Sequence, residues 1–238
     1  AKDCPGKIVR ILLDNFNLTE SALFRINGPV NLNRVIQVYD LAKRADLKFP
    51  NFKQGKADLD EDDPFSSIRD RDILLHHPYQ SFNAVLDLLQ HAANDPQVLA
   101  IKQTLYRTGK DSKIIDHLIT AAQNGKDVSV VVELRARFDE EANLTMANRL
   151  QEAGVQVIYG VVGFKTHAKM MMIVRREGKI LRRYVHLGTG NYHAGTAKVY
   201  TDIGLMTAHS GITEDVHSIF QQLSGMGKAI KLKHLLTS

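Results

Sequence analysis

The chain has 238 residues, of which 44% are hydrophobic, and a formal net charge of +5, so it is long enough to bury a sizeable core and mildly favours an anionic partner. Its single cysteine, Cys4, excludes an internal disulfide, argues against a cysteine-based metal site and indicates an intracellular, cytoplasmic location. No apolar run is long enough to span a membrane and no secretory signal is present, so we expect neither a membrane-spanning nor a secreted protein.

The residues before position 72 show the weakest pattern. Asn31 or Asn33 can cap a helix that runs to about Ala45, because the apolar positions between them follow helical spacing. Gly55, Pro64 and the acidic run over 58–63 predict a linker or exposed loop over 54–72. Because the chain starts without Met and in mid-pattern, we expect it to be a piece of a longer protein that begins with the tail of an adjoining domain.

From residue 73 onward, strand and helix patterns alternate regularly. The expected strands cover 73–75, 98–105, 128–134, 155–159 and 200–205, together with two hairpin strands within 164–174 and 184–193 that a turn at 175–179 joins. The expected helices cover 81–93, 111–125, 140–154 and 213–223. Three strand starts lie about one strand–helix unit apart, which predicts an α/β fold with a mixed sheet flanked by helices, preceded by a partial α+β segment.

The ends of these strands carry basic residues. Arg107 follows the strand over 98–105, Arg135 and Arg137 follow the strand over 128–134, and His167 comes shortly after the strand over 155–159. If the three strands are parallel, Arg107, Arg137 and His167 converge on one edge of the sheet, where open α/β sheets bind ligands. Guanidinium groups suit phosphate oxygens, although each arginine could instead be a surface charge paired with a nearby acid.

The stretch over 164–193 has the densest chemical signal. His167 and Lys169 stand two residues apart at a strand entry, so an extended chain points both to the same face and pairs a nucleophile with a cation. Gly188 and Gly190 allow backbone amides to approach an anion, and Asn191 adds a donor. Between Lys165 and Arg183 there are seven Lys or Arg residues and one acid. We interpret this stretch as an anion site.

Several other residues have both a functional and a structural interpretation. Glycine pairs mark many turns, so the Gly188–Gly190 pair gains weight only from its place after His167. His186 and His193 flank the glycine pair, and the sequence leaves open whether they line the site. His76 and His77 have no carboxylate or cysteine at ligand spacing. Met170 to Met172 are expected to be strand core rather than a set of sulfur ligands.

Four ungapped runs resemble polyphosphate kinases of the long-chain, ATP-polyphosphate phosphotransferase type. They are FKTHAKM from 164, HLGTGNY from 186, IKQTLYRT from 101 and VELRARFD from 132, and the run FRINGPVNL from 24 resembles the end of that family's head domain. The resemblance implies a phospholipase D-like fold. It assigns 1–53 to the C-terminal part of the head domain, 54–72 to a linker and 73–238 to the first phospholipase D-like catalytic domain.

The resemblance also implies roles for individual residues. His167 takes the position of the phosphorylated histidine, Tyr200 an ATP-contacting position, and Arg107 and Arg137 the family's magnesium-associated positions. Because a guanidinium cannot donate a lone pair to a metal, we expect both arginines to hold phosphate oxygens that in turn bind Mg²⁺. The phospholipase D superfamily has an Asp five residues after the Lys of His-x-Lys, whereas this chain has Val174. That departure argues against a plain phosphodiesterase.

The resemblance therefore predicts an enzyme that transfers the γ-phosphate of ATP reversibly to polyphosphate through a phosphohistidine. Lys169, Asn191, Gly188 and Gly190 would assist, and the partners would be ATP, ADP, polyphosphate, Mg²⁺ and the N-terminal and second catalytic domains of the same enzyme. We expect a homo-oligomer that binds no nucleic acid, and peripheral membrane association stays open. The alternatives are a phospholipase D-like phosphodiesterase half and a non-catalytic polyanion-binding fragment, and we expect the isolated chain to be inactive.

Overall fold

The structure is a computed structural model that describes residues 2–50, 52–106, 112–133, 140–160, 166–225 and 231–236, without the side chains at 140 and 142. The chain divides into two compact units, Ala1–Phe52 and Lys53–Ser238. None of the described helices is long and apolar enough to cross a membrane.

The first unit consists of short helices with little core. It contains α1 (Gly6–Asn15), α2 (Ile36–Leu41) and three 3₁₀ turns. The helix predicted to reach Ala45 is shorter, because it starts as a 3₁₀ turn over Leu32–Val35 and ends at Leu41. Val9 is buried, whereas Phe24 is 79% exposed and Phe49 is 92% exposed. The described residues of this unit therefore leave most of their large apolar side chains uncovered.

The second unit is built on a seven-stranded mixed sheet with the strand order β1-β7-β6-β5-β2-β3-β4. The strands are β1 (Ile73–His77), β2 (Val98–Leu105), β3 (Asp127–Val132), β4 (Gln156–Tyr159), β5 (Lys169–Glu177), β6 (Ile180–Gly188) and β7 (Asp202–Thr207). Strands β2, β3 and β4 are parallel, and the other pairings are antiparallel. The predicted α/β class with a mixed sheet is confirmed.

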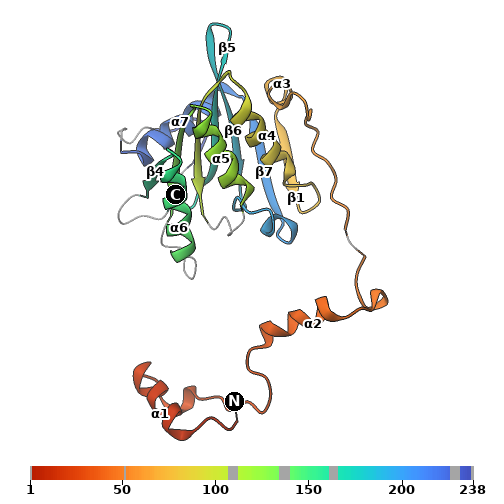
Figure 1. Ribbon diagram of the computed structural model, residues 1–238, viewed down its shortest axis with the longest axis vertical. Helices are drawn as coiled ribbons and strands as arrows, with labels where there is room; N and C mark the ends of the chain where they lie inside the picture. The colour runs from red at the N-terminus through yellow and green to blue at the C-terminus, as the bar shows by residue number, and fades with distance from the viewer. Residues whose placement is uncertain are drawn as a thin grey trace. The chain divides into compact units, whose positions relative to one another are not determined.

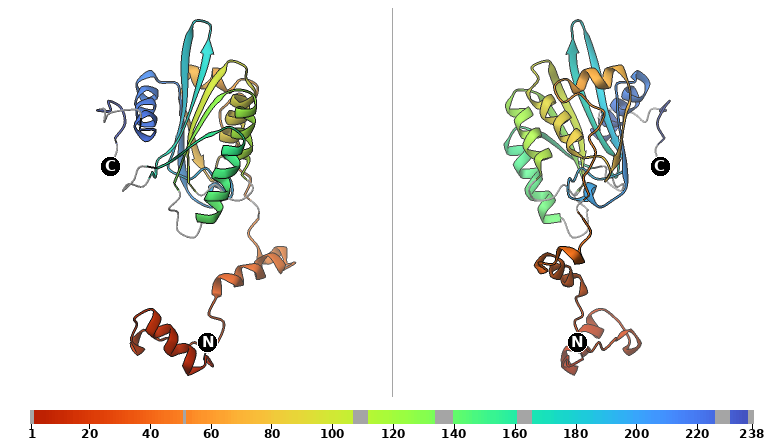
Figure 2. Two further views of the ribbon diagram at one scale, coloured as in Figure 1. Left: turned by 60° about the vertical axis from the view of Figure 1, so that its left-hand side comes forward. Right: turned by 90° about the vertical axis from the view of Figure 1, so that its right-hand side faces the viewer.

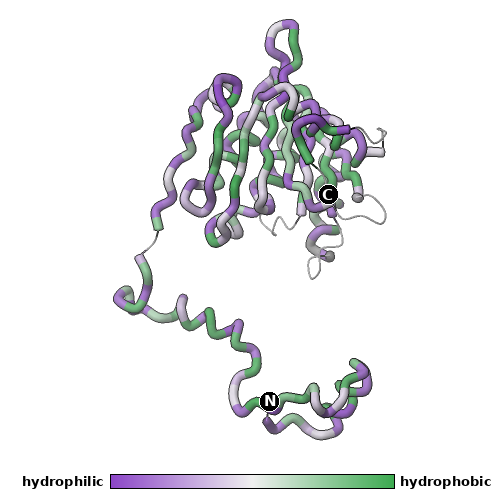
Figure 3. Tube along the Cα trace, turned by 180° about the vertical axis from the view of Figure 1, so that it is seen from behind, coloured by the Kyte–Doolittle hydropathy of each residue, from purple (hydrophilic) through white to green (hydrophobic). Residues whose placement is uncertain are grey.

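Helices cover both faces of the sheet (Figure 2). On one face lie α4 (Asn83–Asn94), α5 (Lys113–Gln123) and α6 (Glu140–Glu152), and on the other lies α7 (Ser210–Leu223) (Figure 1). The larger core lies under α4 and α5 and includes Leu89, Ile101 and Leu118, all fully buried. Figure 3 shows hydrophobic residues along the central strands and hydrophilic residues at the turns.

A smaller core lies between the sheet and α7. Met170 and Met172 on β5 and Val185 on β6 pack there with Val216 and Phe220 of α7. Met171 points to the opposite face and joins the larger core. The three consecutive methionines therefore fill both cores from a single strand, because side chains alternate across a sheet.

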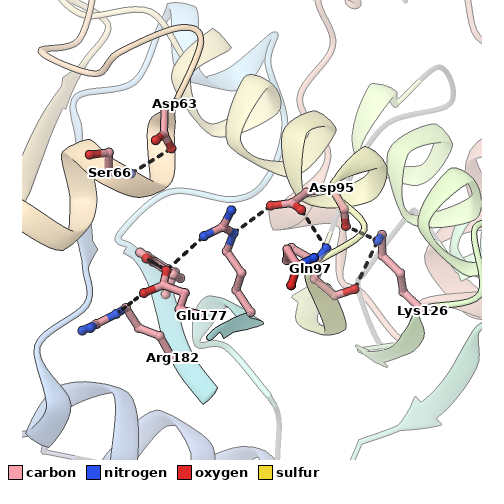
Figure 4. Close-up of polar contacts among 10 residues, drawn as sticks. Asp63, Ser66, Asp95, Gln97, Lys126, Glu177 and Arg182 are labelled. Carbon is pink, nitrogen blue, oxygen red and sulfur yellow. Dashed lines mark hydrogen bonds and ion pairs between the residues drawn. The ribbon is translucent and has the colours of Figure 1, made fainter. Parts of the chain in front are cut away.

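The residues expected to form a linker contain α3 (Pro64–Asp70). The carboxylate of Asp63 accepts a hydrogen bond of 3.0 Å from the backbone nitrogen of Ser66, which caps the helix, and Pro64 stands at its first position (Figure 4). Phe65 and Ile68 are buried in the larger core. The acidic run that indicated a loop therefore ends in a helix cap, and the segment after it packs against the sheet.

The far end of the β5–β6 hairpin is held by ion pairs (Figure 4). Arg175 Nε lies 2.7 Å from Asp95 Oδ2, and Arg182 Nε lies 2.7 Å from Glu177 Oε2. Glu177 also accepts hydrogen bonds from Arg175 and from the hydroxyl of Tyr184. Residue 175 lies six positions beyond Lys169 along β5, which is roughly 20 Å. The basic residues 175–183 are thus remote from His167, and most of the predicted cation density does not belong to one site.

Candidate active site

A threonine on the neighbouring strand fixes the entry to β5. The hydroxyl of Thr104 on β2 donates a hydrogen bond of 2.7 Å to the carbonyl of Ala168 and accepts one of 2.9 Å from the backbone nitrogen of Met170. Thr104 is 3% exposed. This buried hydroxyl holds the backbone on both sides of Lys169, so it sets the position of the His167–Lys169 pair.

The structure brings His167, Lys169 and Tyr106 together at this edge of the sheet. Lys169 is 6% exposed, and its ammonium donates a hydrogen bond of 2.6 Å to the carbonyl of His167. The ammonium also lies 5.7 Å from the centre of the Tyr106 ring, whose centre is 5.6 Å from that of His167 in an edge-to-face arrangement. His167 itself is exposed. A solvent-facing imidazole therefore stands above a sheltered positive charge.

The pKa values of His167 and Lys169 are both lowered by partial desolvation. Partial desolvation, and then the positive charge of Lys169, lower the pKa of His167 below its ordinary value. The neutral, nucleophilic form of the imidazole is therefore favoured at neutral pH. Desolvation also lowers the pKa of Lys169, and the negative charge of Asp202 opposes that change. Asp202 is thus a carboxylate whose charge reaches the site although no sequence motif marked it.

The segment before His167 is tied to β3. The backbone nitrogen of Thr166 donates a hydrogen bond of 3.0 Å to Glu133 Oε2, and Glu133 directly follows β3. A β carbon on Gly160 would lie 3.6 Å from that same carboxylate oxygen. Like Thr104, Tyr106 and Asp202, Glu133 supports the site through contacts that the sequence pattern did not reveal.

The glycine-rich turn after β6 lies beside Lys169. Gly188 is the β6 partner of Lys169 in the strand register. The hydroxyl of Thr189 donates a hydrogen bond of 2.9 Å to Asp202 Oδ1, and its backbone nitrogen donates one of 2.9 Å to the carbonyl of Ile203. A β carbon on Gly190 would lie 2.4 Å from Asp202 Oδ2. Gly190 therefore makes room for Asp202 here, and the proposed anion contacts of Gly188 and Gly190 stay predictions.

Of the remaining predicted residues, the structure describes Tyr200 and Asn191 but not the three arginines. Tyr200 lies just before β7 and is 63% exposed. Its backbone nitrogen donates a hydrogen bond to the carbonyl of Thr196. Asn191 is half-buried in the turn. Arg107 and Arg137, like Arg135, lie outside the described residues.

The described residues do not make a magnesium site by themselves. Among them, no three His, Cys, Asp or Glu side chains are grouped so that they could hold a metal ion. Asp202, whose negative charge raises the pKa of Lys169, accepts a hydrogen bond from the hydroxyl of Thr189. The Mg²⁺ expected from the resemblance therefore stays a prediction.

Comparisons with known proteins agree on one family. Residues 63–229 match the family model for the polyphosphate kinase C-terminal domain 1. The polyphosphate kinase of Xylella fastidiosa is 66% identical over 238 residues, covering 100% of this chain and 34% of that protein. The polyphosphate kinase of Pseudomonas aeruginosa is 55% identical over 235 residues, covering 98% of this chain and 34% of that protein.

Solved structures give the same picture. The crystal structure of polyphosphate kinase from Porphyromonas gingivalis superposes with a TM-score of 0.81 at 33% identity, covering 99% of this chain and 36% of that one. Nuc from Salmonella typhimurium, a phospholipase D family member, superposes with a TM-score of 0.51 at 15% identity, covering 68% of this chain and 98% of that one. At 15% identity, the match with Nuc shows only that the two chains share a fold. The chain spans about a third of the length of the curated relatives it matches.

Proposed function

This chain belongs to the polyphosphate kinase family, and we propose that it supplies the phosphate-accepting histidine of an ATP–polyphosphate phosphotransferase. In the first step a neutral ring nitrogen of His167 attacks the γ-phosphorus of ATP. The new N–P bond forms as the bond from phosphorus to the β,γ-bridging oxygen breaks, and ADP leaves with that electron pair. In the second step a terminal oxygen of polyphosphate takes the phosphoryl group and restores His167.

The observation that carries this proposal is the His167–Lys169 pair. His167 is exposed, so a nucleotide can reach it, and its lowered pKa keeps the ring nitrogen unprotonated. The buried ammonium of Lys169 has three N–H groups and donates one of them to the carbonyl of His167. A phosphate oxygen would restore some of the solvation that this charge has lost, which favours phosphate beside His167.

The other roles follow the family resemblance. We assign Asn191, Gly188 and Gly190 to the phosphate, Tyr200 to ATP, and Arg107 and Arg137 to charge on the transferring phosphoryl group. The Mg²⁺ would come with the nucleotide substrate, and both arginines would contact the phosphate oxygens that hold it. Phosphoryl transfer needs such groups on several sides of the phosphorus, so we propose that this chain acts together with the N-terminal and second catalytic domains.

The proposed domain plan keeps the expected boundaries. Residues 1–53 would end the head domain and 73–238 would form the first catalytic domain, with 54–72 between them, of which α3 packs on the catalytic core. The complete enzyme would be a cytoplasmic homo-oligomer that binds ATP, ADP and polyphosphate. The 34% share of the relatives' length supports this plan, since it leaves room for further domains.

Transfer of label from γ-labelled ATP to protein tests the proposal. In the complete enzyme, wild-type protein should acquire label that is stable in base and labile in acid, as for phosphohistidine. His167→Ala should acquire none, because the attacking nitrogen is gone. His193→Ala is a matched control, since the ring of His193 accepts a hydrogen bond from the nitrogen of Thr196 in its own turn. Undiminished labelling of His167→Ala would refute the assignment.

The rival reading is a phospholipase D-like phosphodiesterase. The position at which that superfamily has Asp holds Val174, which packs partly buried against the smaller core. Cleavage of a phosphodiester substrate without ATP, lost in His167→Ala, would favour this rival over the kinase.

A further inference from the structure

A buried histidine lies directly behind the glycine-rich turn. His186 on β6 is 3% exposed, and its Nδ1 lies 2.9 Å from the hydroxyl of Tyr192, which is also buried. Its other ring nitrogen, Nε2, is buried and makes no hydrogen bond within the described residues. An unpaired polar atom in a protein interior is costly, so it needs a partner.

A second unpaired atom belongs to Asn191, which lines the same small cavity as His186. Asn191 Oδ1 is buried and also makes no hydrogen bond within the described part of the chain. Both residues line a cavity of about 10 Å³, whose walls include His77, Asp202 and Gly204. That volume is about the size of one water molecule, and it is too small for phosphate.

Two glycines beside the cavity lie close to the imidazole of His186. A β carbon on Gly204 would lie 2.8 Å from His186 Nε2, and one on Gly188 would lie 3.2 Å from the same ring. A β carbon on Gly204 would force the imidazole or the backbone to shift, and one on Gly188 would require a shift of a few tenths of an ångström. The two glycines thus leave the space that the imidazole occupies.

The hydrogen-bond pattern determines which atom carries the proton. Burial lowers the pKa of His186 to about 3, so the ring is neutral and has one N–H. Burial raises the pKa of Tyr192, so its hydroxyl keeps its proton. That hydroxyl is 2.9 Å from Nδ1 but 3.4 Å from the carbonyl of His186, which favours donation to Nδ1. Nε2 then carries the ring proton and is a donor facing the cavity.

We propose that His186 is a positioning residue, and that one water molecule in this cavity accepts a hydrogen bond from its Nε2 and donates one to Asn191 Oδ1. This arrangement holds the amide oxygen of Asn191 inward. The NH₂ group of Asn191, which is not among the buried unpaired atoms, then faces outward as a donor. The inference rests on the proposed function, because it is the phosphate at His167 that this donor would bind.

Two direct measurements test the water and the proton position. In the complete enzyme, the ¹⁵N chemical shifts of His186 should show a protonated Nε2, and a crystal structure should show one water within hydrogen-bond distance of Nε2 and Oδ1. Gly204→Ala should lose that water, whereas Gly55→Ala should keep it, because a β carbon there meets nothing closer than 3.6 Å. A protonated Nδ1, or a dry cavity in the wild type, would overturn the proposal.

A double-mutant cycle tests whether His186 acts through Asn191. His186→Phe and Asn191→Ala should each slow labelling of His167 by roughly tenfold, as expected for one lost hydrogen bond. The double variant should be no slower than Asn191→Ala alone, and additive effects would overturn the proposal. If wild-type His167 takes no label, the proposed function fails, while the ¹⁵N and crystal measurements still decide the water site.

Discussion

The pairing of His167 with Lys169 places an exposed imidazole beside a buried positive charge. The ammonium of Lys169 donates a hydrogen bond to the backbone carbonyl of His167, and this bond fixes the end of the lysine side chain relative to the backbone. Its charge and the partial desolvation of the imidazole act in the same direction on the pKa of His167. Both effects favour the neutral form of the imidazole, which is the form that the proposed mechanism needs.

This arrangement predicts how His167 titrates. NMR titration should give a pKa below the ordinary histidine value of about 6.5. Because a lowered pKa means less protonation at any given pH, labelling of His167 should fall with acid only below that value. Lys169→Met removes the charge and should move the pKa upward. Lys179→Met, at the far hairpin turn, should leave it unchanged. Equal pKa values in wild type and Lys169→Met would contradict the electrostatic role of Lys169.

At the scale of elements, the site depends on the contact between β2 and β5. These strands pair antiparallel, so the end of β2 meets the beginning of β5. Thr104 uses this proximity to bond the backbone on both sides of Lys169. The His167–Lys169 pair therefore stands at the entry to β5, which lies beside β2 within the sheet.

Substituting Thr104 should therefore be costly. Thr104→Val keeps the shape but leaves the carbonyl of Ala168 and the nitrogen of Met170 without this partner, and we expect a loss of about 1–3 kcal/mol in the free energy of unfolding. Thr120→Val is the matched control, because its hydroxyl bonds only the carbonyl of Asp116 within a helix. That variant should change stability by less than about 0.5 kcal/mol in urea unfolding. Equal losses in both variants would show that Thr104 does not anchor the strand.

For the whole molecule, the two units differ in how they bury apolar surface. Both core clusters consist of residues from the second unit, beginning with the partly buried Ala57. The first unit leaves Phe24 and Phe49 largely exposed. The second unit thus has what it needs to fold alone, since it holds a sheet with helices on both faces.

Removal of residues 1–52 tests this difference. The melting temperature of the remainder should change by less than about 2 °C, because the removed residues take no part in either described core. Phe65→Ala is the comparison, since Phe65 is 3% exposed in the larger core, and it should cost about 3–5 kcal/mol. Loss of cooperative unfolding in the shortened chain would show that the first unit is needed for the second to fold.

The sequence by itself determined most of the elements and the position of the His167–Lys169 pair. Strand and helix periodicity are local properties, so the alternation after residue 73 could be predicted, and so could the hairpin that follows Lys169. The same local reasoning failed at α3, because an acidic, proline-containing run is compatible with both a loop and a helix cap.

Only the tertiary structure decided what surrounds the pair. Thr104, Glu133 and Asp202 reach it from parts of the chain that are far apart in sequence, so local periodicity does not show these contacts. The basic residues 175–183 lie at the opposite end of the sheet from His167, because an extended strand separates its two ends. His186 Nε2 and Asn191 Oδ1 have no hydrogen-bond partner in the described part of the chain, and their two residues line one cavity that the packing of separate segments creates.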